Sequence, residues 1–223
     1  MTGIESPGSQ ILDPFGAERS DQKFKAAWNV FAMTCGMFMA PEPSYQAWFA
    51  HYLISQYGID RIAREPVIHI RPLPESPFKA RFTGSELRPD VVVTKAPGIM
   101  MPHYANRLAK ADDETGIGLL GHLSVISELK VAATQTGGLD FKAVCKDIDK
   151  LRFLLDAHRT IYPRASSPVA YLCILDNHPR RKKFRFEEIQ QLAHHDDPLL
   201  KVEVLYSEAA EVPNLPDDGV LRR

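Results

Sequence analysis

Three side chains on two short peptides are of the types that together form a site for a metal ion and its substrate. Asp90 ends the peptide Arg-Pro-Asp just before an apolar run of three valines, and Glu128 and Lys130 flank one leucine inside a second apolar run, 123–133. A strand points alternate side chains to one face, so Glu128 and Lys130 should emerge together and meet an aspartate at the head of a neighbouring strand. The two carboxylates would bind a hard divalent cation through oxygen, while the lysine ammonium beside them would steady a water or a phosphate.

Helices and strands around these peptides must position them. Stripes of apolar residues at helical spacing predict helices over 21–40, 44–57, 139–158 and 186–195, with Ser44 capping the second and the strongest pattern in the third. Apolar runs predict strands over 67–70, 90–94, 123–133, 169–175 and 202–206, with 79–83 as a further paired strand in a meander. The order predicts an α/β sandwich with a mixed sheet, in which the third helix crosses over and brings 169–175 beside the motif strand.

Composition predicts one domain with local rather than general affinity for polyanions. The chain has 223 residues, 44% hydrophobic and 25% charged, and a net charge of −1. We expect a flexible tail over 1–20, a single domain over 21–207 and a weakly ordered tail over 208–223. Residues 95–121 form a long insertion rich in Gly, Pro and acids.

The cysteines and the N-terminus predict the compartment. Cys35, Cys145 and Cys173 are odd in number and far apart, which disfavours a disulfide framework or a zinc site and favours a reducing compartment. The first residues lack the pattern of a secretory signal, and the most apolar stretch, 26–40, is shorter than the ~20 residues that span a bilayer. We therefore expect a cytoplasmic protein with no membrane partner.

In motif order and element order, residues 44–206 resemble the PD-(D/E)xK nuclease superfamily, which has the restriction-endonuclease-like fold. The resemblance implies an αβββαβ core with an extra N-terminal helix. It also implies that Asp90 and Glu128 bind Mg²⁺, with Mn²⁺ as a substitute, helped by the backbone carbonyl of Leu129. Lys130 would position or activate the attacking water, and cleavage would leave 5′-phosphate and 3′-hydroxyl ends. DNA is the expected substrate.

Two further features of the sequence bear on this resemblance. Many family members place a Glu, and some a Gln, on the helix before the meander; here it is Gln46, whose amide oxygen would ligate Mg²⁺ without adding charge. The second feature is a dense basic cluster, which could contact nucleic acid or form a solvated turn. It comprises Arg180, Arg181, Lys182, Lys183 and Arg185.

Other interpretations stay open. The same fold could form a non-catalytic nucleic-acid-binding or protein-interaction module in which the motif residues are ion pairs. The segment 116–121 matches the dinucleotide fingerprint GxGxxG, but we interpret it as a flexible lead-in to a strand. We interpret His194 to Asp197 as a helix terminus rather than a metal site. A homodimer would allow both strands of a duplex to be cut, yet no interface signal is visible.

Overall fold

The computed structural model describes residues 17–99, 115–134, 138–178 and 186–208. Most of both predicted tails therefore lies outside the described residues. Helix α1 (Ala17–Cys35) begins before Asp21, so the predicted domain boundary falls within that helix. In the described part of the chain, no helix is long and apolar enough to cross a membrane. Cys35, Cys145 and Cys173 are all free thiols, as expected.

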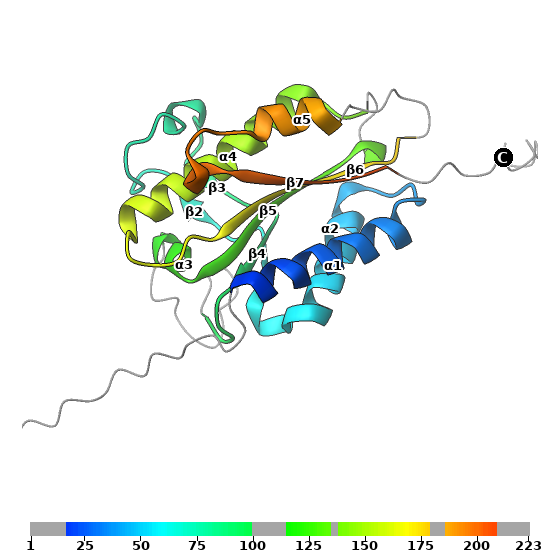
Figure 1. The fold of residues 1–223 in the computed structure, drawn as a ribbon, viewed down its shortest axis with the longest axis horizontal. Helices are drawn as coiled ribbons and strands as arrows, with labels where there is room; N and C mark the ends of the chain where they lie inside the picture. Colours follow the sequence, from blue (N-terminus) through cyan, green and yellow to red (C-terminus); the bar gives the residue numbers. More distant parts are fainter. Residues whose placement is uncertain (1–16, 100–114, 135–137, 179–185, 209–223) are drawn as a thin grey trace, which may run out of the picture.

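A mixed sheet of five strands forms the centre of the fold (Figure 1). Its strand order is β1-β4-β5-β6-β7, and β2 and β3 form a small second sheet. Strand β4 is antiparallel to β1 and β5, whereas β5, β6 and β7 run parallel to one another. The strands are β1 (Ile62–Arg64), β2 (Ile68–His69), β3 (Glu86–Leu87), β4 (Val91–Thr94), β5 (Leu123–Val131), β6 (Val169–Asp176) and β7 (Val202–Glu208).

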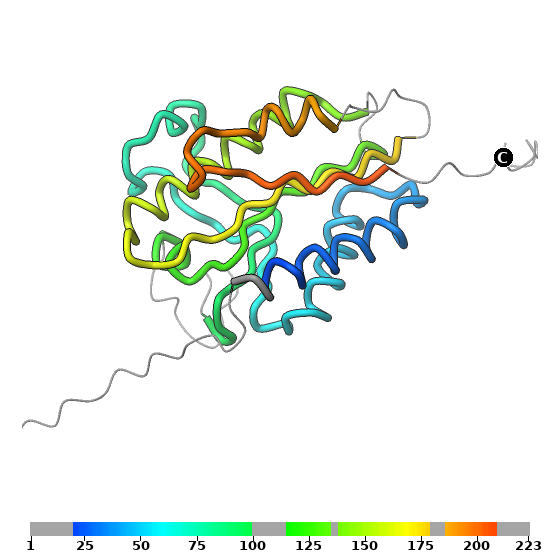
Figure 2. The backbone as a smooth tube through the Cα atoms, viewed as in Figure 1, coloured from blue at the N-terminus to red at the C-terminus, as the bar shows by residue number. Residues whose placement is uncertain are grey.

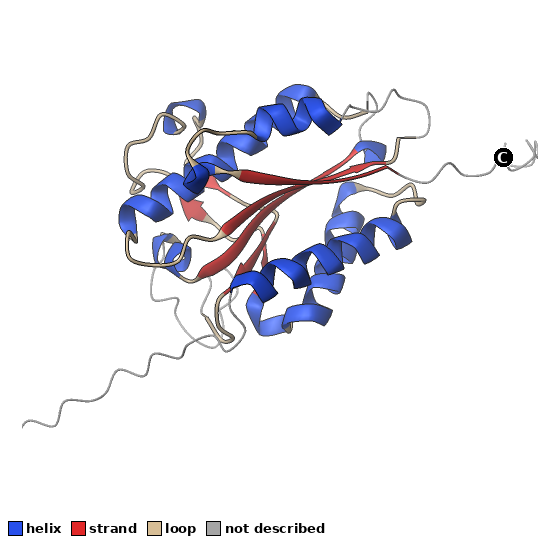
Figure 3. Cartoon of the chain, in the orientation of Figure 1, coloured by secondary structure: helices blue, strands red, loops and turns tan. Residues whose placement is uncertain are grey.

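Helices cover both faces of the sheet (Figure 3). Helices α1 and α2 (Glu42–Tyr57) lie on one face, where Phe24, Phe49 and Tyr171 share a core. Helices α4 (Phe141–Ile161) and α5 (Phe186–Ala193) lie on the other, where Ile126 packs with Ile148. Strand β5 is thus covered on both faces, so a charged side chain on it needs a partner within the protein.

The crossover from β5 through α4 to β6 has the predicted form (Figure 2). Helix α4 begins where Asp140 accepts a hydrogen bond from the Lys142 amide at 3.0 Å, and its apolar stripe packs on the sheet. Strand β6 then pairs in parallel with β5. The α/β class and the mixed sheet predicted from the pattern are therefore confirmed.

Several local predictions were wrong. Residues 79–81 form the short helix η2 (Lys79–Arg81) rather than a strand, because β2 pairs instead with β3, joining Ile68 to Leu87. Strands β1 and β3, each too short for a periodic pattern, were missed. Helix α2 begins after Pro41, so Ser44 lies inside its first turn and is not its cap. The remaining short helices are η1 (Ile59–Arg61), η3 (Ala132–Thr134) and η4 (Pro198–Leu200).

The glycine segment forms a short helix, α3 (Ile117–Gly121), rather than a flexible lead-in. Gly116 starts it in the left-handed conformation, with φ at 77°. A dinucleotide fingerprint belongs to a parallel strand–helix–strand unit, whereas the flanking strands β4 and β5 are antiparallel. The fold therefore excludes that interpretation of the segment.

Candidate active site

The pairing of β4 with β5 brings the three predicted side chains to one face of the sheet. Val91 pairs with Ser127, so Asp90, one position further out, comes opposite Glu128. Residues directly opposite each other in an antiparallel pair project to the same face, and Lys130 follows two positions after Glu128. Ile126, of the same parity, packs with residues of α4, which places Glu128 and Lys130 on the α4 side.

Asp90 is held by two hydrogen bonds. The Leu129 amide donates to its Oδ2 at 2.7 Å, and the Gln46 side chain donates to its Oδ1 at 3.2 Å. The amide oxygen of Gln46 in turn accepts from Arg64 at 3.1 Å. Helix α2 thus brings Gln46 to the site as predicted, but Gln46 presents its amide nitrogen, not its oxygen, to Asp90. Its position suits a residue that orients Asp90.

Glu128 is almost completely buried, with 1% of its surface exposed. Its Oε2 accepts a hydrogen bond from the Lys150 ammonium at 2.6 Å. Its Oε1 is buried and has no hydrogen-bond partner among the described residues. Burial, followed by the nearby Asp90 carboxylate, raises the pKa of Glu128 well above its ordinary value, and Lys150 offsets only part of this effect.

Helix α4 adds two residues that the sequence analysis did not place in the site. The Asp147 carboxylate lies 2.7 Å from the Lys130 ammonium and, through its other oxygen, 3.8 Å from Lys150. Three positions apart on a helix, residues 147 and 150 share a face. The crossover prediction placed this helix over the motif strand, so polar residues bordering its apolar stripe were a signal that could have found them.

Both lysines keep their protons. Burial by itself would lower the pKa of Lys130, but Asp147, then Asp90 and Glu128, outweigh it and raise the pKa. The pKa of Lys150 is likewise raised, because Glu128 and Asp147 outweigh its burial. Each lysine is therefore a fixed positive charge and a hydrogen-bond donor, and neither is prepared to take a proton.

The donor set fits a hard cation. Asp90 and Glu128 offer carboxylate oxygens only, and the Oε1 atom of Glu128 has no hydrogen-bond partner among the described residues. Mg²⁺ in proteins commonly binds one or two carboxylates and keeps several waters. With Asp147 included, three carboxylates face two ammoniums, so the ionised site is one negative charge in excess. Among the described residues, no group of three or more His, Cys, Asp or Glu side chains is arranged so that it could hold a metal ion.

Lys130, Asp147 and Lys150 also line a cleft of about 510 Å³. We call it the basic cleft, because five cationic and two anionic side chains line it. One wall is the stretch 81–88, around strand β3, and the other is a face of α4. The charged lining residues are Arg81, Arg88, Lys130, Lys146 and Lys150, with Glu86 and Asp147.

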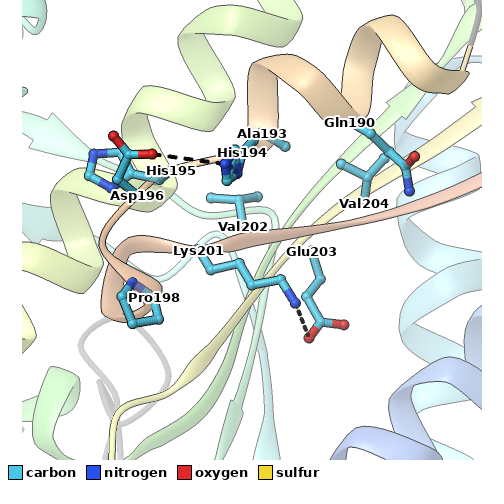
Figure 4. Close-up of a pocket in the computed structure, with 10 residues that line it drawn as sticks. All are labelled: Gln190, Ala193, His194, His195, Asp196, Pro198, Lys201, Val202, Glu203 and Val204. Atoms are coloured by element: carbon cyan, nitrogen blue, oxygen red, sulfur yellow. Dashed lines mark ion pairs between the residues drawn. The ribbon is translucent and has the colours of Figure 1, made fainter.

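A second hollow, of about 420 Å³, lies between α5 and β7 (Figure 4). His194, His195 and Asp196 line it beside an ion pair of Lys201 and Glu203 at 3.7 Å. Helix α5 ends at Ala193, so these histidines lie at a helix terminus, as predicted. The predicted basic cluster at 180–185 lies outside the described residues.

Comparisons with family models, curated proteins and solved structures gave no significant match to this chain.

Proposed function

We propose that this protein is a metal-dependent nuclease of the PD-(D/E)xK type that hydrolyses phosphodiester bonds, with DNA as the expected substrate. The observation that carries the proposal is the meeting of Asp90, Glu128 and Lys130 on one sheet face, with an unpartnered oxygen on Glu128. The order α2, β1, β4, β5, α4, β6 also agrees with the αβββαβ core that the resemblance implies, with α1 as the extra helix.

Each residue has a role that follows from its contacts. Asp90 and Glu128, with the Leu129 carbonyl, would hold Mg²⁺ or Mn²⁺, and Gln46 would keep the Asp90 carboxylate in place. A bound divalent cation neutralises phosphate charge and lowers the pKa of a coordinated water. Lys130, protonated and held by Asp147, would donate hydrogen bonds to that water or to phosphate oxygens.

The basic cleft supports a polyanionic substrate. The chain as a whole is nearly neutral, yet the lining of this cleft has an excess of positive charge and includes Lys130, Asp147 and Lys150 of the site. A local concentration of Lys and Arg is the usual means of binding a phosphate backbone. The cleft supports the proposal from described residues, whereas the predicted 180–185 cluster lies outside them.

One observation favours the non-catalytic alternative. The pairs Lys150–Glu128 and Lys130–Asp147 already place an ammonium against each of two buried carboxylates. In a binding or interaction module, these ion pairs would be permanent. In a catalytic site, they would be present only while no metal is bound. The two proposals differ in whether a divalent cation binds the site and so changes the protein's activity and stability.

A cleavage assay separates them. We expect the wild-type chain to cut supercoiled plasmid, single-stranded circular DNA or RNA with Mg²⁺ or Mn²⁺ and not with EDTA. Asp90→Asn and Lys130→Ala should each slow cleavage by at least about 100-fold, since each removes a charge placed for the transition state. Gel electrophoresis of the products measures both rates.

Lys142→Ala is the matched control, because Lys142 is an exposed lysine of α4 outside the basic cleft. It should cleave like the wild type. Cleavage that survives in both site variants would remove the assignment. Binding of nucleic acid without cleavage under any metal, together with melting unaffected by Ca²⁺, would favour the non-catalytic module.

A further inference from the structure

The basic cleft has an aromatic side chain as well as cations. Phe82 is half-buried and lines the cleft. Its ring stacks on Phe153 of α4, with centroids 5.9 Å apart and planes 14° apart. One face of the ring is thus held by the core. An aromatic ring fixed in this way beside positive charge is the arrangement on which proteins stack the bases of single-stranded nucleic acid.

Two of the five cations of the cleft, Lys146 and Lys150, lie along one face of α4. Ala143, Lys146, Asp147 and Lys150 all line it, at the spacing of one helical stripe. Lys130 and Lys150 are engaged by the site carboxylates, and Arg81 and Arg88 form ion pairs with Asp149 and Glu86. Lys146 is exposed, and no ion pair involves it among the described residues. It is the cation of the cleft best placed to meet a phosphate.

The cleft has the size of a small-molecule pocket, of the order of 300–1,000 Å³, at 510 Å³. A duplex keeps its bases stacked inside and paired, so it could offer phosphates to Lys146 but no base face to Phe82. An unpaired strand can offer both.

We propose that the basic cleft binds one unpaired strand of nucleic acid, with a base stacked on Phe82 and its backbone on Lys146, leading to Lys130 and Lys150. This inference rests on the proposed nuclease function and adds the substrate class, which is single strands or unpaired ends rather than intact duplex. The shared chemistry is an aromatic base next to a phosphodiester, so DNA and RNA strands are separate arms of the test.

Fluorescence anisotropy in EDTA tests binding without cleavage. Labelled oligonucleotides of one sequence are compared as single-stranded DNA, duplex DNA and single-stranded RNA with the full chain. We expect single strands to bind about tenfold or more tightly than the duplex. Phe82→Leu should weaken single-strand binding about fivefold or more, whereas Phe82→Trp should retain it because the ring face is kept. Lys146→Glu should weaken binding and reduce the salt dependence.

Two matched controls lie on α4 outside the cleft. Phe141→Leu removes an aromatic ring that is 42% exposed, and Lys142→Glu makes the same charge change as Lys146→Glu. Both should bind like the wild type, and melting of every variant reports whether it folds. Duplex binding as tight as single-strand binding, or single-strand binding unchanged in a folded Phe82→Leu, would overturn the inference.

Failure of this inference and failure of the nuclease proposal give different results. Metal-dependent cleavage of duplex that is lost in Asp90→Asn, with binding insensitive to Phe82, overturns only the single-strand inference. Phe82-dependent binding of single strands with no cleavage in any metal overturns the nuclease and leaves the cleft as a binding site.

Discussion

Lys150 stands against Glu128 in a site with little access to water. The side chains of this ion pair are 16% and 1% exposed, and the ammonium also donates to the backbone carbonyl of Arg88 at 3.2 Å. Glu128 would be an uncompensated buried charge without it. Removing one partner of a buried pair typically costs about 3–5 kcal/mol, while replacing both partners costs much less.

We expect Lys150→Met to lower the free energy of unfolding by about 3 kcal/mol in EDTA, and the double variant Lys150→Met with Glu128→Gln to recover most of that loss. Ca²⁺ should stabilise Lys150→Met more than the wild type, because in this variant the bound cation replaces the positive charge that Lys150 places beside Glu128. Urea unfolding with and without Ca²⁺ measures both effects.

Lys25→Met is the control for this prediction. Lys25 pairs with Asp21 and Glu203, but its side chain is 39% exposed, so the loss should be about 1 kcal/mol or less. Equal stabilisation of wild type and Lys150→Met by Ca²⁺ would contradict a cation site at Glu128.

At the scale of elements, the end of the long insertion is fastened to strand β2. The Thr115 carbonyl accepts a hydrogen bond from the His69 amide at 2.8 Å. Gly116 follows with a positive φ, and a Cβ atom there would lie 2.3 Å from the Val67 carbonyl oxygen. The close approach of two backbones therefore requires glycine at this position.

Gly98 offers a matched comparison, since its φ is +71° but a Cβ atom there would meet no atom of the described residues within 4 Å. Gly98→Ala should lower the free energy of unfolding by only roughly 1 kcal/mol, which is the strain of placing alanine in the left-handed conformation. Gly116→Ala adds a backbone clash and should cost roughly 2 kcal/mol more. Urea denaturation of the two variants gives the difference, and equal losses would show that β2 does not pack against Gly116.

For the whole molecule, a buried histidine contributes to the response to acid. His158 of α4 is 1% exposed, and neither ring nitrogen has a hydrogen-bond partner among the described residues. Burial, and secondarily the positive charge of Lys95, lowers its pKa to about 4 from 6.5. Tyr162 is the ring beside it, at 5.7 Å between centroids. The folded protein thus holds His158 neutral while the unfolded chain can protonate it.

Between pH 6.5 and about 4, His158 is protonated in the unfolded chain but neutral in the folded protein. Its contribution to stability should therefore fall as the pH is lowered through that window and stay constant below it. His158→Leu should flatten this part of the curve and cost little at pH 7, where it removes buried polar atoms without partners. Melting temperatures across the window test this. A wild-type curve that His158→Leu leaves unchanged would contradict it.

The sequence by itself determined the long elements and the parts of the site that lie on them. Helix α4 and strands β5 and β6 carry enough apolar residues for their period to be read, and that period places Glu128 and Lys130 on one face. The aspartate at the head of β4 followed from the same reasoning. These features are local, because a side chain's direction along a regular element depends only on its position in that element.

Only the tertiary structure decided which side chains complete the site. Asp147 and Lys150 reach Lys130 and Glu128 because α4 packs over β5, and Gln46 presents its nitrogen because Arg64 takes its oxygen. The two-residue strand β3 exists only through its pairing with β2. Such contacts join residues far apart in the chain, and no periodicity in a single segment encodes a partner that another segment brings.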